Sequence, residues 1–360
     1  MKMCHAYATL GHDVQLVVPD HQEGIEADVE DVHAFYGVPR TFEIVKVRSF
    51  RPLKFWYAII LSLFAIRNTR ADLYHTRISW TAWGLSTLFR RPTILELHEV
   101  PIDGSLESRC IFHATRQKQL RYLIAITKAL KERLADVTHS SCEVVVAADG
   151  VDARLATSSL SQLDAKNEVG VGEGQGLTAV YAGHLYPGRG IEVVVEMASR
   201  NPAIAFHVIG GREEDIRQWR SKVQHLKNVR FEGFVPPKKV YGYLRAADIL
   251  LMPYANKVGT SGRGDTAAVC SPMKMFEYMA AGRPILSSDL PVLQEVLRPD
   301  VNCLIAPYGD IDRWVSQLKR LEQDAQLRMR LGDQARRDVM AYTWEARAEK
   351  LLAACAFQPS

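Results

Sequence analysis

The stretch SPMKMFEYMAAGRPILSSD, residues 271–289, combines residue types that can bind a phosphate. Its Ser-Pro start is typical of a helix N-terminus, with Ser271 as the N-cap and Pro272 at the first helical position. The amides of Met273 and Lys274 then have no acceptor within the helix, and they lie at the positive end of the helix dipole beside the Lys274 charge. Because such an end binds anions, the pattern predicts a diphosphate site.

Glu277 follows one turn later in this otherwise apolar helix. A ribose attached to the diphosphate would come within reach of its carboxylate, which accepts hydrogen bonds from vicinal hydroxyls as the acidic residue of a dinucleotide site does. A structural salt bridge for Glu277 and a Lys274 side chain that extends to solvent explain the same residues. The helix alone does not separate the two interpretations.

A second candidate region is YAGHLYPGRGIE, residues 181–192. A predicted strand ends at Gly183, a Gly/Pro turn follows, and Gly190 begins a helix. Loops at the carboxyl ends of parallel strands are where doubly wound sheets bind ligands. Gly183 would let a phosphate approach the backbone, and Arg189 could neutralise its charge. The alternative is an ordinary glycine turn with a solvated arginine.

Short β-branched strands alternate with helical stretches along the whole chain, which predicts parallel sheets covered by helices on both faces. Two such series indicate two doubly wound α/β domains. We expect an N-terminal domain over 1–155, a Ser- and Gly-rich flexible linker over 156–176, and a second domain over 177–339. The opening residues run from a helix end through Gly11 into a strand, so the first domain is expected to lack the initial strand and Gly-rich turn of a Rossmann-like fold.

The composition is that of an ordinary globular protein, with 47% apolar and 24% charged residues. The net charge of +4 is too small to favour nucleic acid as the main partner. Six scattered cysteines predict reduced thiols in a cytosolic protein. The apolar run over 55–66 is too short to span a bilayer and is expected to be a buried helix, although its basic flanks leave peripheral membrane contact through 48–70 open.

Together these regions resemble the family 4 glycosyltransferases. The helix at 271–289 matches the family signature in its Ser-Pro-x-Lys variant, and AGHLYPGRG (182–190) resembles the family's glycine-rich loop. EGFVPPKKVYGYLRAADILLMPY (232–254) is similar to the strand, loop and helix whose loop backbone contacts the base. The resemblance covers most of 72–352 and is strongest after 178.

The resemblance implies a GT-B fold, in which two Rossmann-like domains face a cleft. It implies retaining transfer of a sugar from a nucleotide diphosphate sugar to a glycan or lipid-linked acceptor, with the donor bound by the C-terminal domain. The last helix, about 340–360, would pack back on the first domain. No metal or other cofactor is expected, because basic side chains and the helix N-terminus would carry the charge of the leaving diphosphate.

The resemblance also assigns the site residues. Arg189 and Lys274 would stabilise the leaving diphosphate, and His98, at the end of the strand LELH, would lie near the transferred sugar. The implied donor-binding residues are Gly183, His184, Phe234, Val235, Ser271, Pro272, Met273, Lys274 and Glu277.

Two departures from the family pattern concern the donor. Val269 stands where the family has the first of two glutamates, which removes the usual carboxylate contact to the transferred sugar. His184 and Arg189 stand where the loop has its arginine and lysine, so one fixed charge becomes titratable. Asp310 and Asp312 form an Asp-x-Asp pair of the kind that binds metal in another glycosyltransferase fold, but here they are expected to cap a helix.

Two other functions remain open at this stage. The chain could be a truncated, inactive module that binds nucleotide sugar or serves a partner subunit. It could also be a nucleotide-sugar epimerase on the same fold plan, which would need an acid and a base, and the sequence offers only His98 and Glu99 for them.

Overall fold

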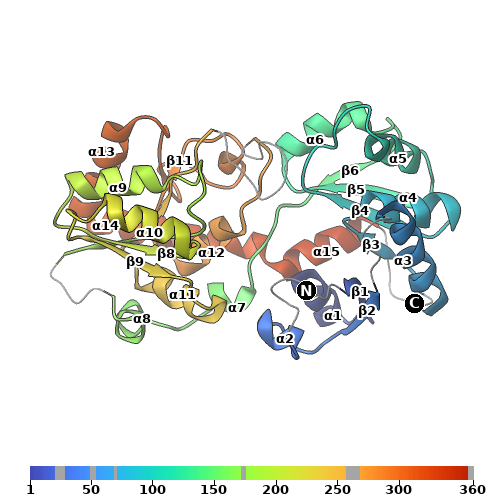
Figure 1. Ribbon diagram of the computed structural model, residues 1–360, viewed down its shortest axis with the longest axis horizontal. Coiled ribbons are helices and arrows are strands. Elements are labelled where there is room, and N and C mark those ends of the chain that lie inside the picture. Colours follow the sequence, from blue (N-terminus) through green and yellow to red (C-terminus); the bar gives the residue numbers. More distant parts are fainter. Residues whose placement is uncertain (21–28, 49–53, 69–70, 172–175, 257–267, 356–360) are drawn as a thin grey trace. The chain divides into compact units, whose positions relative to one another are not determined.

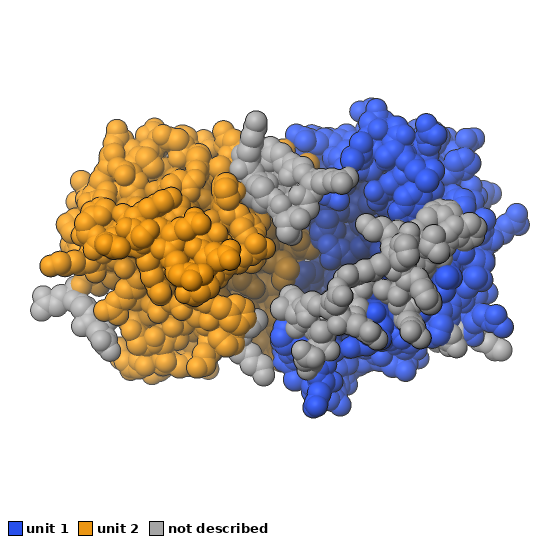
Figure 2. All heavy atoms as spheres, in the orientation of Figure 1, with its two compact units in different colours: residues 1–148, 344–360 blue, residues 149–343 orange. Residues whose placement is uncertain are grey.

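The computed structural model describes residues 1–360 except 21–28, 49–53, 69–70, 172–175, 257–267 and 356–360 (Figure 1). The chain divides into two compact units, which Figure 2 colours separately. Unit 1 comprises residues 1–148 and 344–360, and unit 2 comprises residues 149–343. The first unit therefore ends at residue 148, whereas the sequence led us to expect a boundary at residue 155.

Unit 2 contains a parallel six-stranded sheet in the order β12-β11-β10-β7-β8-β9. The chain adds β8 and β9 on one side of β7, then returns to the other side with β10, which is the doubly wound pattern. Buried apolar side chains of strands and helices form one core that includes Phe206 and Trp314. The strands are β7 (Thr178–Ala182), β8 (Ala205–Ile209), β9 (Val229–Gly233), β10 (Ile249–Met252), β11 (Ile285–Ser288) and β12 (Leu304–Ala306).

Helices connect these strands, as the alternating pattern predicted. The longer ones are α9 (Ile191–Arg200), α10 (Glu213–Lys222), α11 (Pro237–Ala246), α12 (Met273–Ala281), α13 (Ile311–Gln323) and α14 (Ala325–Asp338).

Unit 1 contains two separate parallel sheets. The larger has the order β3-β4-β5-β6, and the smaller pairs β1 with β2. The first element of the chain is a helix, α1 (Lys2–Thr9), and in the described part of the chain no strand joins the two sheets. The strands are β1 (Gln15–Asp20), β2 (Glu43–Arg48), β3 (Tyr74–Thr76), β4 (Thr93–Leu97), β5 (Leu120–Ala125) and β6 (Val144–Val146).

The helices of unit 1 are mostly short. They include α2 (Val32–Phe35), α3 (Lys54–Asn68), α4 (Ser79–Trp83), α5 (Leu106–Thr115) and α6 (Lys128–Leu134), with a turn of π-helix over Gly84–Leu88. The apolar run at 55–66 lies within α3, and among the described residues no helix is long and apolar enough to cross a bilayer.

The last helix, α15 (Trp344–Ala354), belongs to unit 1 although unit 2 precedes it in the chain. Trp344 and Ala348 form a small buried cluster with Ala6 of α1. The Tyr122 hydroxyl of β5 donates a hydrogen bond to the Leu351 carbonyl. The helix expected at about 340–360 therefore packs on the first unit, with residues 356–360 outside the described part.

The segment expected to be a flexible linker, 156–176, is structured in its described part, so that prediction was wrong there; residues 172–175 lie outside it. It contains α8 (Gln162–Val169), which packs on α11 within unit 2. Lys166 Nζ lies 3.0 Å from Asp248 Oδ2, and the Arg245 guanidinium donates to the Leu160 carbonyl. The polar composition reflects helix caps and ion pairs.

Candidate functional site

The carboxyl ends of β7, β8 and β9 leave backbone uncovered, because a glycine follows or ends each strand. Gly183, Gly210 and Gly233 have φ values of 151°, 96° and 76°, in the region that favours glycine. The Gly210 amide donates to the Gly233 carbonyl at 2.7 Å, and a Cβ on Gly210 would lie only 2.7 Å from the Gly183 oxygen. The glycine at position 210 is therefore required where the ends of these strands pack closely together.

The N-terminus of α12 lies beside Gly183. The Tyr278 hydroxyl accepts a hydrogen bond from the amide of Ala182 at 2.8 Å, which ties the helix to the end of β7. A Cβ on Gly183 would lie 3.3 Å from Lys274 Nζ. The signature helix and the glycine turn, predicted separately, thus lie next to each other.

The start of α12 differs from the prediction by one residue. The helix begins at Met273, with Pro272 as its N-cap residue. Ser271 does not cap the helix; its Oγ accepts a hydrogen bond from the Asp149 amide at 3.1 Å. The amides of Met273 and Lys274 still belong to the first turn, where no helical carbonyl precedes them.

Few of the described groups around the Lys274 amine stabilise a positive charge on it. Its Nζ donates to the Ala182 carbonyl at 3.4 Å and lies 4.6 Å and 4.4 Å from the ring centroids of Tyr181 and Tyr254. Burial lowers the pKa of Lys274 to about 7, and the nearby charge of Arg189 contributes to the same shift. An anion bound here would offset both effects and raise the pKa of Lys274 again.

Arg189 brings a second charge to the same place. Its Nη1 donates to the Tyr254 hydroxyl at 3.1 Å, while its Nε is buried and has no hydrogen-bond partner among the described residues. A buried donor without an acceptor is uncommon, and a phosphate oxygen is the kind of acceptor that would satisfy it.

His184 contributes no fixed charge. Its ring stacks on Tyr186, with centroids 4.6 Å apart and an interplanar angle of 8°, and the Arg212 guanidinium lies 5.2 Å from the centroid of the Tyr186 ring. Burial lowers the pKa of His184, and the charges of Arg189, Arg212 and Lys274 lower it further. A bound diphosphate would favour its protonated form.

The remaining predicted donor residues lie farther along the same edge or the same helix. Phe234 is 81% exposed and follows β9 with Val235, so both are separated from Gly183 by the width of β8. Glu277 is half-buried, one turn along α12, and its charge raises the pKa of Lys274.

Sequence reasoning missed the aromatic lining of this site. The rings of Tyr181 and Tyr254 lie against Lys274. Arg212 comes shortly after the glycine that follows β8, just as Gly183 follows β7. The repeated pattern was a usable signal for Arg212. Contact between Tyr254 and Lys274 depends on the sheet order and had no local signal.

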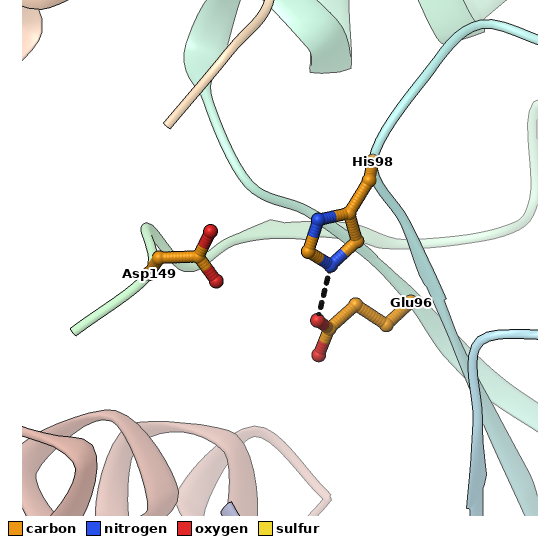
Figure 3. A group of neighbouring side chains, drawn as sticks. All are labelled: Glu96, His98 and Asp149. Atoms are coloured by element: carbon orange, nitrogen blue, oxygen red, sulfur yellow. Dashed lines mark hydrogen bonds and ion pairs between the residues drawn. The ribbon is translucent and has the colours of Figure 1, made fainter. Parts of the chain in front are cut away.

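In unit 1, His98 follows β4, and Figure 3 shows its ring bonded to Glu96. The distance from His98 Nε2 to Glu96 Oε1 is 2.6 Å. Glu96 is only 4% exposed, and His98 is 26% exposed. Arg77 is exposed, and its Nε lies 3.8 Å from the same carboxylate.

The Asp-x-Asp pair has the structural role predicted for it. The Asp310 side chain accepts a hydrogen bond from the Arg313 amide at 2.9 Å and caps α13. Asp312 forms an ion pair with Arg200 at 2.6 Å.

Comparison with known families accounts for both units. The family model described as Glycosyltransferase Family 4 matches residues 1–155. The model described as Glycosyl transferases group 1 matches residues 164–338. The chain belongs to the family 4 glycosyltransferases.

Relatives within this group have curated names. The amylovoran biosynthesis glycosyltransferase AmsK of Erwinia amylovora is 34% identical over 95 residues, which are 26% of this chain and 22% of AmsK. A D-inositol 3-phosphate glycosyltransferase of Corynebacterium efficiens is 24% identical over 239 residues, 61% of this chain and 53% of the relative. The matched regions thus span about a fifth to a half of these relatives.

Solved structures of glycosyltransferases share the fold. Anabaena Alr3699/HepE, solved in complex with UDP, has a TM-score of 0.71 and 15% identity, with 95% of this chain and 99% of that chain covered. A glycosyltransferase from Rickettsia africae has a TM-score of 0.76 and 13% identity, with coverage of 98% and 92%. The fold is therefore of the GT-B type, as predicted.

Proposed function

We propose that this protein is a retaining glycosyltransferase that moves a sugar from a nucleotide diphosphate sugar to a glycan or lipid-linked acceptor without a metal ion. The observation that carries the proposal is that Lys274 of the α12 N-terminal turn lies beside Gly183, with the Arg189 charge near enough to lower the pKa of Lys274. Anabaena Alr3699/HepE has been solved both with UDP and with UDP-glucose, which supports a nucleotide-sugar donor.

The proposed donor site assigns one task to each group. The diphosphate accepts hydrogen bonds from the first-turn amides of α12, from Lys274 and from the unsatisfied Nε of Arg189. Glu277 accepts hydrogen bonds from the ribose hydroxyls, and the backbone of Phe234 and Val235 contacts the base. His184 donates to the diphosphate once it is protonated.

Charge stabilisation is the main catalytic contribution of these residues. Negative charge builds up on the diphosphate as its bond to the sugar breaks, and Arg189 and the Lys274 side chain, protonated in the complex, lie where that charge develops. Lys274 and Arg189 supply the positive charge that a divalent cation supplies in metal-dependent glycosyltransferases. In unit 1, we assign His98 to the transferred sugar.

The first test is calorimetric titration of the protein with UDP, GDP, ADP and TDP. We expect one of them to bind, and Glu277→Ala to weaken it at least tenfold because a buried pair of ribose hydrogen bonds is lost. Glu168→Ala, an exposed carboxylate on α8, is the matched control and should bind normally. If none binds the folded wild type, the donor site is wrong.

Activity then separates the enzyme from a binding module. Transfer from the sugar nucleotide that binds, followed by NMR of the new anomeric centre, should show retained configuration and should persist in EDTA. If the protein binds the donor but neither transfers the sugar nor slowly hydrolyses the donor, the result would favour the inactive module.

We further propose that the protein acts in the cytoplasm, with peripheral contact to the inner face of the membrane through 48–70. Its six cysteines are free, as is usual in reducing compartments. On α3, Ile60 and Leu63 are 46% and 41% exposed; residues 49–53 and 69–70 lie outside the described part. Sedimentation with anionic phospholipid vesicles tests this, and the double change of both residues to serine should reduce binding severalfold.

A further inference from the structure

Unit 1 buries a carboxylate that the proposed chemistry does not use. Glu96 lies on β4, and its Oε2 is 3.1 Å from His75 Nε2 and 3.0 Å from an Nη of Arg347 on α15. Its Oε1 is 2.6 Å from His98 Nε2. Burial alone would raise the pKa of Glu96, but the hydrogen bonds from His75 and His98 and the Arg347 charge outweigh it and hold that pKa well below its ordinary value.

The bonds around Glu96 fix the positions of several protons. An ionised carboxylate only accepts hydrogen bonds, so both His75 and His98 must carry hydrogen on Nε2. The Tyr7 hydroxyl of α1 lies 3.1 Å from His75 Nδ1. Burial raises the pKa of Tyr7, so Tyr7 remains a phenol, and it donates to that nitrogen when the His75 ring is neutral with its hydrogen on Nε2. Donation therefore runs from Tyr7 through His75 to Glu96, and from His98 to Glu96.

We propose that Glu96 is a positioning residue that holds His98 in one tautomer and one ring orientation for sugar transfer. Nε2 of His98 is committed to the carboxylate, and Nδ1 points away from it (Figure 3). In the neutral ring Nδ1 then accepts a hydrogen bond from a hydroxyl of the sugar. The assignment of His98 to the sugar rests on the proposed function, whereas the geometry around Glu96 does not.

Because His98 is partly exposed, it needs a hydrogen-bond acceptor such as Glu96 to fix its ring more than a buried histidine would. His98 can rotate about its side-chain bonds and exchange its proton with water, and either change would move the acceptor nitrogen. Glu96 is itself held in place, since Arg347 also donates through Nε to the Ala148 carbonyl at 2.8 Å. Among the described residues, Arg77 also faces the carboxylate, but it lies at 3.8 Å and is mostly exposed.

The direct test is NMR of the histidine rings in the full-length protein labelled with ¹⁵N-histidine. His98→Gln identifies the His98 signals. We expect the neutral ring of His98 in the wild type to carry its proton on Nε2, with a downfield proton resonance that exchanges slowly with water. In Glu96→Gln this slow exchange should be lost. A neutral His98 with its proton on Nδ1, or a ring that exchanges as fast as an exposed histidine, would overturn the proposal.

Kinetics add a readout that general loss of stability does not produce. Glu96→Gln should lower kcat roughly tenfold to a hundredfold, the range seen when a carboxylate that orients a metal-ligating histidine is removed. The Kd for the nucleoside diphosphate should not change, because unit 2 binds it. Glu143→Gln, an exposed carboxylate of unit 1, is the control and should keep the wild-type kcat.

The experiments on Glu96 can fail or succeed independently of the experiments on the donor site. Wild-type protein that fails to bind any diphosphate refutes the donor site while leaving the ring measurement valid. If Glu96→Gln does not fold, the wild-type spectrum alone decides the tautomer. A folded Glu96→Gln protein with kcat within twofold of wild type would refute the positioning role.

Discussion

Binding of a nucleoside diphosphate should be accompanied by proton uptake, because Lys274 is largely neutral in the free protein above neutral pH. Its pKa is lowered to about 7, first by burial and then by Arg189. A diphosphate against Nζ replaces the lost solvation and restores a pKa near the ordinary value of about 10.4. The site therefore gains a proton as it gains its ligand.

The size of the effect follows from the pKa. At pH 8 about a tenth of the Lys274 side chains are protonated in the free protein and nearly all in the complex, so about 0.9 proton is taken up per nucleotide. At pH 6 the uptake falls to about 0.1. The pKa of Lys274 is depressed in the free protein and raised in the complex, so the contribution of Lys274 to affinity is full below pH 7 and falls about tenfold per pH unit above it.

Calorimetry at pH 8 in two buffers of different ionisation enthalpy measures this uptake as the slope of the observed enthalpy. Lys274→Met should abolish it. His184 also has a lowered pKa and could contribute, so His184→Gln should retain most of the slope. A wild-type uptake below about 0.2 proton at pH 8, with the nucleotide bound, would show that Lys274 is already charged in the free protein and would refute the reasoning.

Three further predictions concern the framework of unit 2. Gly190→Ala places a Cβ 1.7 Å from the Pro253 carbonyl oxygen, so urea unfolding should show a loss of about 3 kcal/mol or more, and a loss below about 1 kcal/mol would contradict the packing. Tyr278→Phe leaves the last amide of β7 without its acceptor and should cost about 1–3 kcal/mol in the same assay. The hydrogen bond from His207 lowers the pKa of Glu232, so this pair stabilises the fold above the unfolded pKa of Glu232 and the contribution disappears as pH falls through the lower, folded pKa. Unfolding of Glu232→Gln should differ from wild type at pH 7, and the difference should shrink as pH falls below the unfolded pKa of Glu232; a difference that does not change with pH would exclude the linkage.

Local patterns predicted those parts of the fold that local chemistry determines. Apolar strands identified β7 and β10, the glycine after β7 marked a ligand-binding turn, and Asp310 marked the start of α13. The linker prediction failed because polar residues were interpreted as an absence of structure. Ser161 caps α8 and Gly170 ends it at φ 66°, so the signals for a helix were present in the same residues.

The contacts that tune the site could not be predicted in this way. Tyr254 reaches Lys274 because β10 lies beside β7, and sheet order follows from packing of the whole unit. Glu96 lies in the strand TILEL, where a single carboxylate gives no sign of its partners. Those partners include His75 of β3 and Arg347 of α15, which are far apart in sequence. Tyr7 of α1 in turn contacts His75.

The place of α15 has a consequence for the order in which the protein can mature on the ribosome. Unit 2 is one continuous segment and can complete its core as soon as it has emerged. Residues 1–148 of unit 1 are synthesised before unit 2, but unit 1 also needs α15, which follows unit 2 in the chain. Until then the nascent unit holds Glu96 without Arg347 and exposes the face of α1 that Trp344 later covers. Unit 1 can therefore complete its fold only after unit 2 has been synthesised.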